Sequence, residues 1–107
     1  MKRLVTYFFL ALFLPLFSLG QKVIAIRIDG TINPASADFI HHAIEKAEKE
    51  KAECLIIHLN TPGGLLTSTR NIVSDLLVSP VPVIVYVSPE GAHAGSAGVF
   101  ITLAAHI

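Results

Sequence analysis

Residues 54–64 read CLIIHLNTPGG, an almost unbroken apolar run that ends in a loop of small residues. A short apolar run bounded by turn residues predicts a buried strand over 54–59. The two glycines that follow let the backbone take torsions closed to other residues and come close to a ligand. A strand that leads through such a loop into a helical pattern is typical of the ligand-binding edge of an α/β sheet.

Strand and helix patterns alternate along the rest of the chain. The strand patterns cover residues 22–28, 54–59 and 81–87, and the helical patterns begin at Asn33, Leu65 and Ser96. Asn33 and Pro34 suit the N-cap and the first position of a helix. This β-α-β-α-β-α order predicts an α/β fold with parallel strands alternating with helices. The third strand is apolar on both faces, as in parallel sheets that are covered on both sides.

The chain begins with a basic and then strongly apolar segment. Residues 1–3 read MKR, residues 4–17 are apolar apart from Thr6, and Ser18-Leu19-Gly20 has the small-x-small form of a cleavage site. This order predicts a signal peptide over residues 1–20, with an uncleaved anchor as the alternative. A membrane span needs about 20 apolar residues, so the run is short for one. We therefore expect export, with residues 21–107 forming the mature part.

Composition and the end of the sequence set further limits. The 107 residues carry no formal net charge, which removes any general electrostatic case for a nucleic-acid partner. Cys54 is the only cysteine, and its apolar flank predicts a small buried side chain. No His-Glu-x-x-His motif or cysteine pair is present, so we expect no metal and no cofactor. Residues 100–107 read as a helix without a stop signal, which predicts a domain truncated at its C-terminus.

A second loop of small residues, 91–98, reads GAHAGSAG and carries Ser96. It loosely meets the Gly-x-Ser-x-Gly elbow, with Ala94 in place of the first glycine. The alternatives are that Ser96 is a plain helix N-cap and that 60–64 is a plain strand-to-helix loop. Because both loops follow parallel strands, we expect the Ser96 hydroxyl to face the Gly63 and Gly64 amides across one crevice. A nucleophile beside bare backbone amides serves acyl transfer.

A serine nucleophile needs a base, and the histidines offer a poor one. His41 and His42 are expected at a helix surface, and His58 as a satisfied structural histidine in a strand. His93 lies only three residues before Ser96 across a tight turn, and His106 lies further along the last helix. No Ser-His-Asp set assembles from these residues, so we expect the base to lie beyond Ile107.

The segments LNTPGGL (59–65) and AHAGSAG (92–98) resemble the membrane-bound serine proteases of the NfeD family, relatives of ClpP and signal peptide peptidase A. The resemblance covers residues 23–107. It implies a ClpP/crotonase-like spiral and Ser96 as the nucleophile. It also implies an oxyanion hole at Gly63, Gly64 and Ala97, in which Gly63 shapes the loop. The general base implied is a lysine downstream of this sequence.

The resemblance implies an exported, membrane-associated endopeptidase with a Ser-Lys dyad, its protease part on the periplasmic or extracellular side. The implied substrates are apolar segments of membrane partners of the stomatin type. We also expect a homo-oligomer. One alternative is an inactive membrane scaffold that binds a stomatin-like partner. Another is a crotonase-type acyl-CoA enzyme, which the signal segment disfavours. Residues 21–107 alone are expected to be inactive, because the base is missing.

Overall fold

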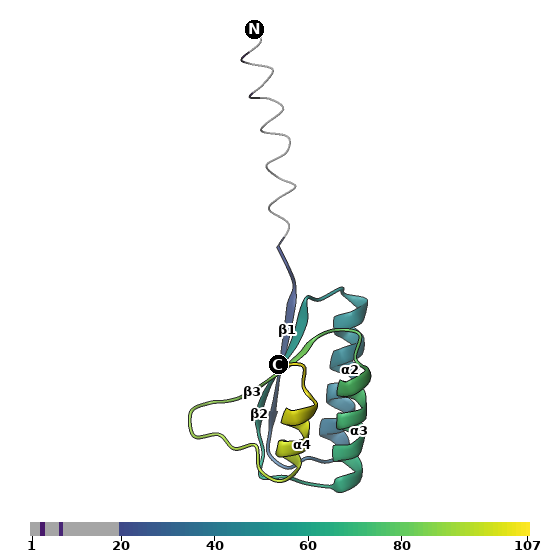
Figure 1. The fold of residues 1–107 in the computed structure, drawn as a ribbon, viewed down its shortest axis with the longest axis vertical. Helices are drawn as coiled ribbons and strands as arrows, with labels where there is room; N and C mark the ends of the chain where they lie inside the picture. The colour runs from purple at the N-terminus through teal and green to yellow at the C-terminus, as the bar shows by residue number, and fades with distance from the viewer. Residues whose placement is uncertain (1–2, 4–6, 8–19) are drawn as a thin grey trace.

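The computed structural model describes residues 3, 7 and 20–107 (Figure 1). Within 20–107 strands and helices alternate as β1 (Val23–Asp29), α2 (Pro34–Lys49), β2 (Cys54–Asn60), α3 (Leu66–Val78), β3 (Val83–Val87) and α4 (Ala97–Ala104). The predicted α/β order is confirmed, with bounds that shift by one or two residues except at the end of α4. Most of the predicted signal peptide lies outside the described residues. In the described part, no helix combines the length and apolarity needed to cross a bilayer.

The described strands form one parallel sheet in the order β1-β2-β3. Arg27 pairs with His58 and His58 with Tyr86, so the strands stand in a common register. The carboxyl ends therefore meet at one edge, where Asp29 lies beside Asn60. This edge receives the loops that follow each strand, which is where α/β sheets place their ligands.

The core lies between one face of the sheet and the three helices. Figure 1 shows α2, α3 and α4 on the same side of the strands. Alternate strand residues point to that side, as the period of two requires. The fully buried apolar side chains at this interface include Leu55, Ile57, Leu59, Val83, Ile40, Ile72, Leu76 and Ile101.

The opposite face of the sheet is open among the described residues. This differs from the prediction of a sheet covered on both sides, because all three described helices pack on one side. Val23 is 50% and Tyr86 58% exposed on the open face. Cys54 pairs with Val23 there, and it is half-buried rather than buried as predicted.

The start of α2 follows the prediction. Asn33 is the N-cap, and its Oδ1 accepts the Ser36 N–H at 2.9 Å. In turn, the Ser36 hydroxyl accepts the Asn33 N–H at 2.9 Å, which completes a capping box. Pro34 occupies the first helical turn, where its missing N–H costs nothing.

The end of α4 corrects a prediction. The helix stops at Ala104 instead of continuing to Ile107, and Ala105 is extended at φ −67° and ψ 156°. His106 and Ile107 then lie along the edge of β3. The His106 N–H donates to the Val83 carbonyl at 2.9 Å, and the Val85 N–H donates to the Ile107 carbonyl at 3.0 Å. These sheet-edge bonds replace helical ones, and the local sequence carries no sign of them.

Candidate active site

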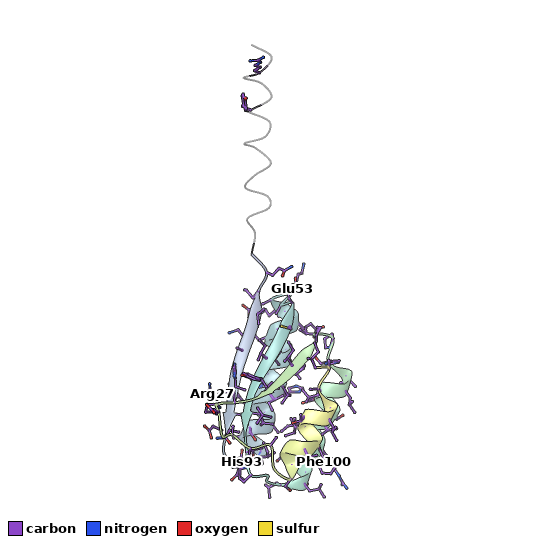
Figure 2. All side chains as sticks on the ribbon, turned by 60° about the vertical axis from the view of Figure 1, so that its left-hand side comes forward. Arg27, Glu53, His93 and Phe100 are labelled. Atoms are coloured by element: carbon purple, nitrogen blue, oxygen red, sulfur yellow. The ribbon has the colours of Figure 1, made fainter. Side chains whose placement is uncertain are left out.

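The two small-residue loops lie side by side at the carboxyl edge of the sheet. Thr61 and Ala94 form a parallel bridge. The Thr61 N–H donates to the His93 carbonyl at 2.7 Å, and the Gly95 N–H donates to the Thr61 carbonyl at 2.9 Å. Figure 2 shows His93 and Phe100 at this end of the molecule and Glu53 at the other. The predicted meeting of the loops at one edge is confirmed.

Ser96 occupies a strained turn between the loop and α4. Its backbone torsions are φ 49° and ψ −108°, a left-handed conformation uncommon for a residue with a side chain. Ser96 is exposed, and its hydroxyl makes no hydrogen bond with the described residues. An ordinary N-cap serine would bind an amide of its own helix. The conformation instead matches a sharp strand-to-helix turn that presents the hydroxyl.

Gly63 packs directly against Ser96. A Cβ built on Gly63 would lie 2.8 Å from the Ser96 Cβ and 3.2 Å from its Oγ. The φ of Gly63 is +131°, which side-chain-bearing residues rarely adopt. Both space and backbone torsion therefore require glycine here. Ser96 and the 60–64 loop are therefore neighbours in contact at the carboxyl edge of the sheet.

The three predicted oxyanion-hole amides differ in their hydrogen bonding. The Gly63 N–H donates to the Thr61 Oγ1 at 3.1 Å, so it is engaged. Gly64 is exposed and bridges to Ile32, and a Cβ on Gly64 would collide with the Ile32 backbone. Among the described residues, the N–H groups of Gly64 and Ala97 donate to no acceptor. Two of the three amides thus have no hydrogen-bond partner in the described part of the chain; of these two residues, Gly64 is exposed and Ala97 is buried.

Small residues around Ser96 let the two loops approach closely. A Cβ on Gly95 would come within 3.1 Å of the Pro62 carbonyl oxygen. A Cβ on Gly98 would lie 2.9 Å from the Thr61 Cγ2 and 3.2 Å from the Ala94 Cβ. The glycines at 95 and 98 are therefore explained by contacts with the neighbouring loop and with the turn itself.

Asn60 ties three segments together beside this site. Its Nδ2 donates to the Asp29 Oδ1 at 3.3 Å, and its Oδ1 accepts the His93 N–H at 3.0 Å. A carboxylate only accepts hydrogen bonds, whereas an amide donates and accepts. Asn60 is thus suited to bridge the Asp29 carboxylate and the backbone of the Ser96 loop.

No described residue acts as a base toward Ser96. The described lysines lie at the opposite edge of the sheet, at the start of β1 or the end of α2: Lys22, Lys46, Lys49 and Lys51. The Lys22 Nζ lies 3.1 Å from the Glu50 Oε1 at that edge. The His93 ring makes no hydrogen bond with Ser96. The described residues also contain no His/Cys/Asp/Glu group that could hold a metal ion.

The other histidines have structural partners. The half-buried His58 has its Nδ1 2.8 Å from the Ser88 Oγ, and its ring packs edge-on to Tyr86. The exposed His41 joins α2 to α3, with its Nδ1 3.0 Å from the Asp75 Oδ2. The hydrogen bond to Asp75 and the negative charge of Asp75 raise the pKa of His41 above 6.5. The nearby Glu45 carboxylate raises it further.

Sequence reasoning missed Thr61 and Ile32, which hold the Gly63-Gly64 loop. Ile32 is fully buried, and its backbone bonds to Gly63 and Leu65. Thr61 is also fully buried, and the one signal in the sequence was a threonine placed between an apolar run and the glycine pair.

A family model and two curated relatives match this chain. The model for the N-terminal domain of NfeD1b matches residues 22–107. The membrane-bound protease PH1510 of Pyrococcus horikoshii is 37% identical over 108 residues, covering 100% of this chain and 24% of that protein. The membrane protein NfeD1b of Bacillus subtilis is 32% identical over 76 residues, covering 71% and 17%. The chain therefore spans about a quarter or less of these relatives.

Solved structures of a related protease share the fold. A serine-to-alanine mutant of the 1510-N membrane-bound stomatin-specific protease has a TM-score of 0.79 at 40% identity, covering 82% of this chain and 43% of that one. A lysine-to-alanine mutant of 1510-N, in complex with a substrate peptide, has a TM-score of 0.79 at 41% identity, covering 82% and 40%. This chain thus corresponds to less than half of each solved chain.

Proposed function

This chain belongs to the family of NfeD1b N-terminal domains, and on that premise we propose that it carries the nucleophile of an exported, membrane-associated serine endopeptidase. The observation that supports the proposal best is the contact between Ser96 and Gly63, where a Cβ on the glycine would lie 3.2 Å from the serine Oγ. It brings a strained, exposed hydroxyl beside a glycine loop. The neighbouring Gly64 and Ala97 amides have no acceptor among the described residues.

In the proposed mechanism the Ser96 Oγ attacks the carbonyl carbon of a peptide bond. A lysine supplied beyond Ile107 takes the serine proton, which requires burial to lower the lysine pKa toward neutrality. The carbonyl oxygen becomes an oxyanion and accepts hydrogen bonds from the Gly64 and Ala97 N–H groups. The lysine then returns the proton to the leaving amine, and water hydrolyses the acyl-enzyme. Gly63 shapes the loop, since its own N–H is bound to Thr61.

The proposed substrates are apolar segments of stomatin-like membrane proteins. Support comes from the solved relative, whose name describes a membrane-bound stomatin-specific protease. We place the protease part on the periplasmic or extracellular side because residues 1–20 have the pattern of a signal peptide. A homo-oligomer and the ClpP/crotonase-like spiral, both taken from the family resemblance, complete the proposal.

The second candidate is an inactive scaffold that binds a stomatin-like partner. Support for it comes from NfeD1b of Bacillus subtilis, whose name describes a membrane protein and no activity. The two functions differ in one feature of the full-length protein: a lysine that contacts Ser96 is present in the enzyme and absent in the scaffold.

The test is cleavage of an apolar stomatin-derived peptide by the full-length protein and by its Ser96→Ala variant. Loss of a serine nucleophile removes on the order of 10⁴-fold or more of kcat, so cleavage should fall to background. Ser88→Ala is the matched control, because Ser88 lies in the loop before Ser96 and its hydroxyl meets His58. Undiminished cleavage by Ser96→Ala would refute the proposal that Ser96 is the nucleophile of an endopeptidase. Absence of cleavage by the unmodified protein, with retained partner binding, would favour the scaffold.

A further inference from the structure

The Thr61 side chain makes hydrogen bonds with both the backbone N–H and the carbonyl oxygen of Gly63. The Thr61 side chain is fully buried. Its Oγ1 accepts the Gly63 N–H at 3.1 Å and donates to the Gly63 carbonyl oxygen at 3.1 Å. A single hydroxyl therefore fixes the orientation of the peptide planes on both sides of Gly63.

The second of these planes contains the Gly64 N–H. In a trans peptide the C=O and the following N–H point in opposite directions. The Gly63 carbonyl oxygen accepts from the Thr61 hydroxyl and from the Ile32 N–H at 2.8 Å. The Gly64 N–H must then point away from Thr61 and Ile32. Hydrogen bonds to a carbonyl also polarise the N–H of the same peptide group, which strengthens it as a donor.

Thr61 also holds the turn that carries Ser96. Its backbone binds His93 and Gly95. Its methyl group lies against Gly98 in the first turn of α4, where an added Cβ would be 2.9 Å from the Thr61 Cγ2. One residue therefore contacts the glycine loop with its hydroxyl and the serine turn with its backbone and methyl.

We infer that Thr61 is a positioning residue. It aims the Gly64 amide at the oxyanion, the former substrate carbonyl oxygen in the adduct with Ser96. The inference rests on the proposed function. Thr61 touches no substrate in this role, and it acts through the Gly63-Gly64 peptide. Its hydroxyl, rather than its methyl group, determines how strongly the site prefers a tetrahedral oxyanion to a planar carbonyl.

The test compares two inhibitors in the full-length protein. An apolar peptide aldehyde forms a hemiacetal: the Ser96 Oγ bonds to the aldehyde carbon, and the carbonyl oxygen becomes the oxyanion or takes the serine proton. The matching peptide alcohol forms no such bond. In Thr61→Val the aldehyde should bind about 10-fold or more weakly, with the alcohol unchanged, and kcat should fall while KM holds. Thr61→Ser keeps the hydroxyl and should retain the preference for the aldehyde.

Thr69→Val is the matched control, since the buried Thr69 hydroxyl donates to the Leu65 carbonyl at 2.8 Å, a carbonyl that the Thr69 N–H also binds. Equal weakening of both inhibitors in Thr61→Val, or no change, overturns the inference. If Thr61→Val fails to fold, Thr61→Ala is compared with Thr61→Ser, since both lack the methyl group and only the serine keeps the hydroxyl. Loss of the aldehyde preference in Thr61→Ala alone supports the inference, and equal preference in the two variants overturns it. The Ser96→Ala variant distinguishes failure of the proposed function from failure of the inference about Thr61. Cleavage by Ser96→Ala overturns the proposed function itself, whereas an inactive Ser96→Ala with a normal Thr61→Val overturns only the role of Thr61.

Discussion

At the scale of single residues, the backbone of Ser96 is held in a conformation that an isolated serine avoids. A residue in such a sparsely populated region costs about 1–3 kcal/mol and persists only when its surroundings enforce it. Here the Gly98 N–H closes the turn onto the Gly95 carbonyl at 2.9 Å, and the Val99 N–H binds the Ser96 carbonyl at 3.0 Å. The strain keeps the hydroxyl out of the helix cap and exposed.

Gly63→Ala should disrupt this arrangement in two ways. The backbone at φ +131° disfavours alanine, and the new methyl group would overlap the Ser96 Cβ at 2.8 Å. We expect a loss of about 1–3 kcal/mol in the free energy of unfolding from the torsion alone. Displacement of Ser96 should also lower kcat/KM about 100-fold, since misplacement by about 1 Å has that effect. Urea denaturation and peptide cleavage by the full-length protein measure the two effects.

Gly30→Ala provides the control for Gly63→Ala. Gly30 also has a positive φ, +109°, but a Cβ there meets nothing within 4 Å. It should therefore lose comparable stability and keep its cleavage rate. Equal losses of activity in the two variants would show that backbone strain, rather than the contact with Ser96, explains the effect.

The residue types alone predicted that Ser96 and the 60–64 loop would meet. Serine among tiny neighbours and paired glycines at the ends of parallel strands leave few other arrangements. They did not reveal that the Gly63 amide is bound to Thr61 while the Gly64 amide is not. That difference depends on the torsion angles of the loop, which a pattern of residue types does not fix.

At the scale of elements, the N-termini of the helices differ. Asn33 and Ser36 close the start of α2 with reciprocal hydrogen bonds. By contrast, the N-cap residues of α3 and α4, Leu65 and Ser96, make no side-chain capping bond. Both uncapped ends lie next to the candidate site. The Asn-Pro pair made the cap of α2 predictable. A serine before a helix looks like an N-cap from sequence alone, and only the torsion angles of Ser96 show that its hydroxyl does not cap α4.

The α2–α3 contact should make stability depend on pH through His41. Its pKa is raised, first by hydrogen bonding to Asp75 and then by the charges of Asp75 and Glu45. A group with a raised folded-state pKa contributes stability below its unfolded value, here 6.5, and loses it as the pH rises through the folded value. The contribution should be small and sensitive to salt, because His41 is exposed.

NMR titration of the His41 ring in the full-length protein measures that pKa directly. Asp75→Asn should return the value toward 6.5. Urea midpoints at low salt, compared between the unmodified protein and His41→Gln, should converge as the pH rises past the folded value. Midpoints that diverge in that direction would contradict the sign argued for this contact.

At the scale of the whole molecule, the described residues leave two surfaces uncovered. One is the open sheet face, where the exposed side chains of Val23 and Tyr86 stand among polar residues such as Arg27 and His58. The other is apolar and lies on α3 and α4, where Leu66, Leu77, Phe100 and Leu103 are each more than half exposed. Contiguous exposed apolar surface of this kind marks a place where something else binds. Parallel sheets in particular are covered on both faces in stable proteins.

Residues 21–107 expressed alone should therefore be marginally stable and inactive. Domains of this size bury only about 60–65% of their unfolded surface. We expect a low thermal midpoint, strong binding of a hydrophobic dye, and no peptide cleavage above the level of the Ser96→Ala form of the same segment. Cleavage that depends on Ser96 in this segment would show that a base lies within it.

The alternation of strands and helices was predictable across the molecule because hydrophobic periodicity reports which side of an element is buried. It does not report what buries it. The apolar residues on the outer face of β3 therefore predicted a cover that the described helices do not provide. The end of α4 was missed for a similar reason, since a neighbouring strand edge, rather than a local residue, ends the helix.

The bridge between Thr61 and Ala94 has a consequence for how such a protein changes over evolution. The two loops are joined there by main-chain bonds, which every amino acid except proline can make. Substitutions at positions of these segments where no glycine is required and no side chain holds the site leave those main-chain bonds in place. The surface around the two loops is thus able to vary while the loops stay joined.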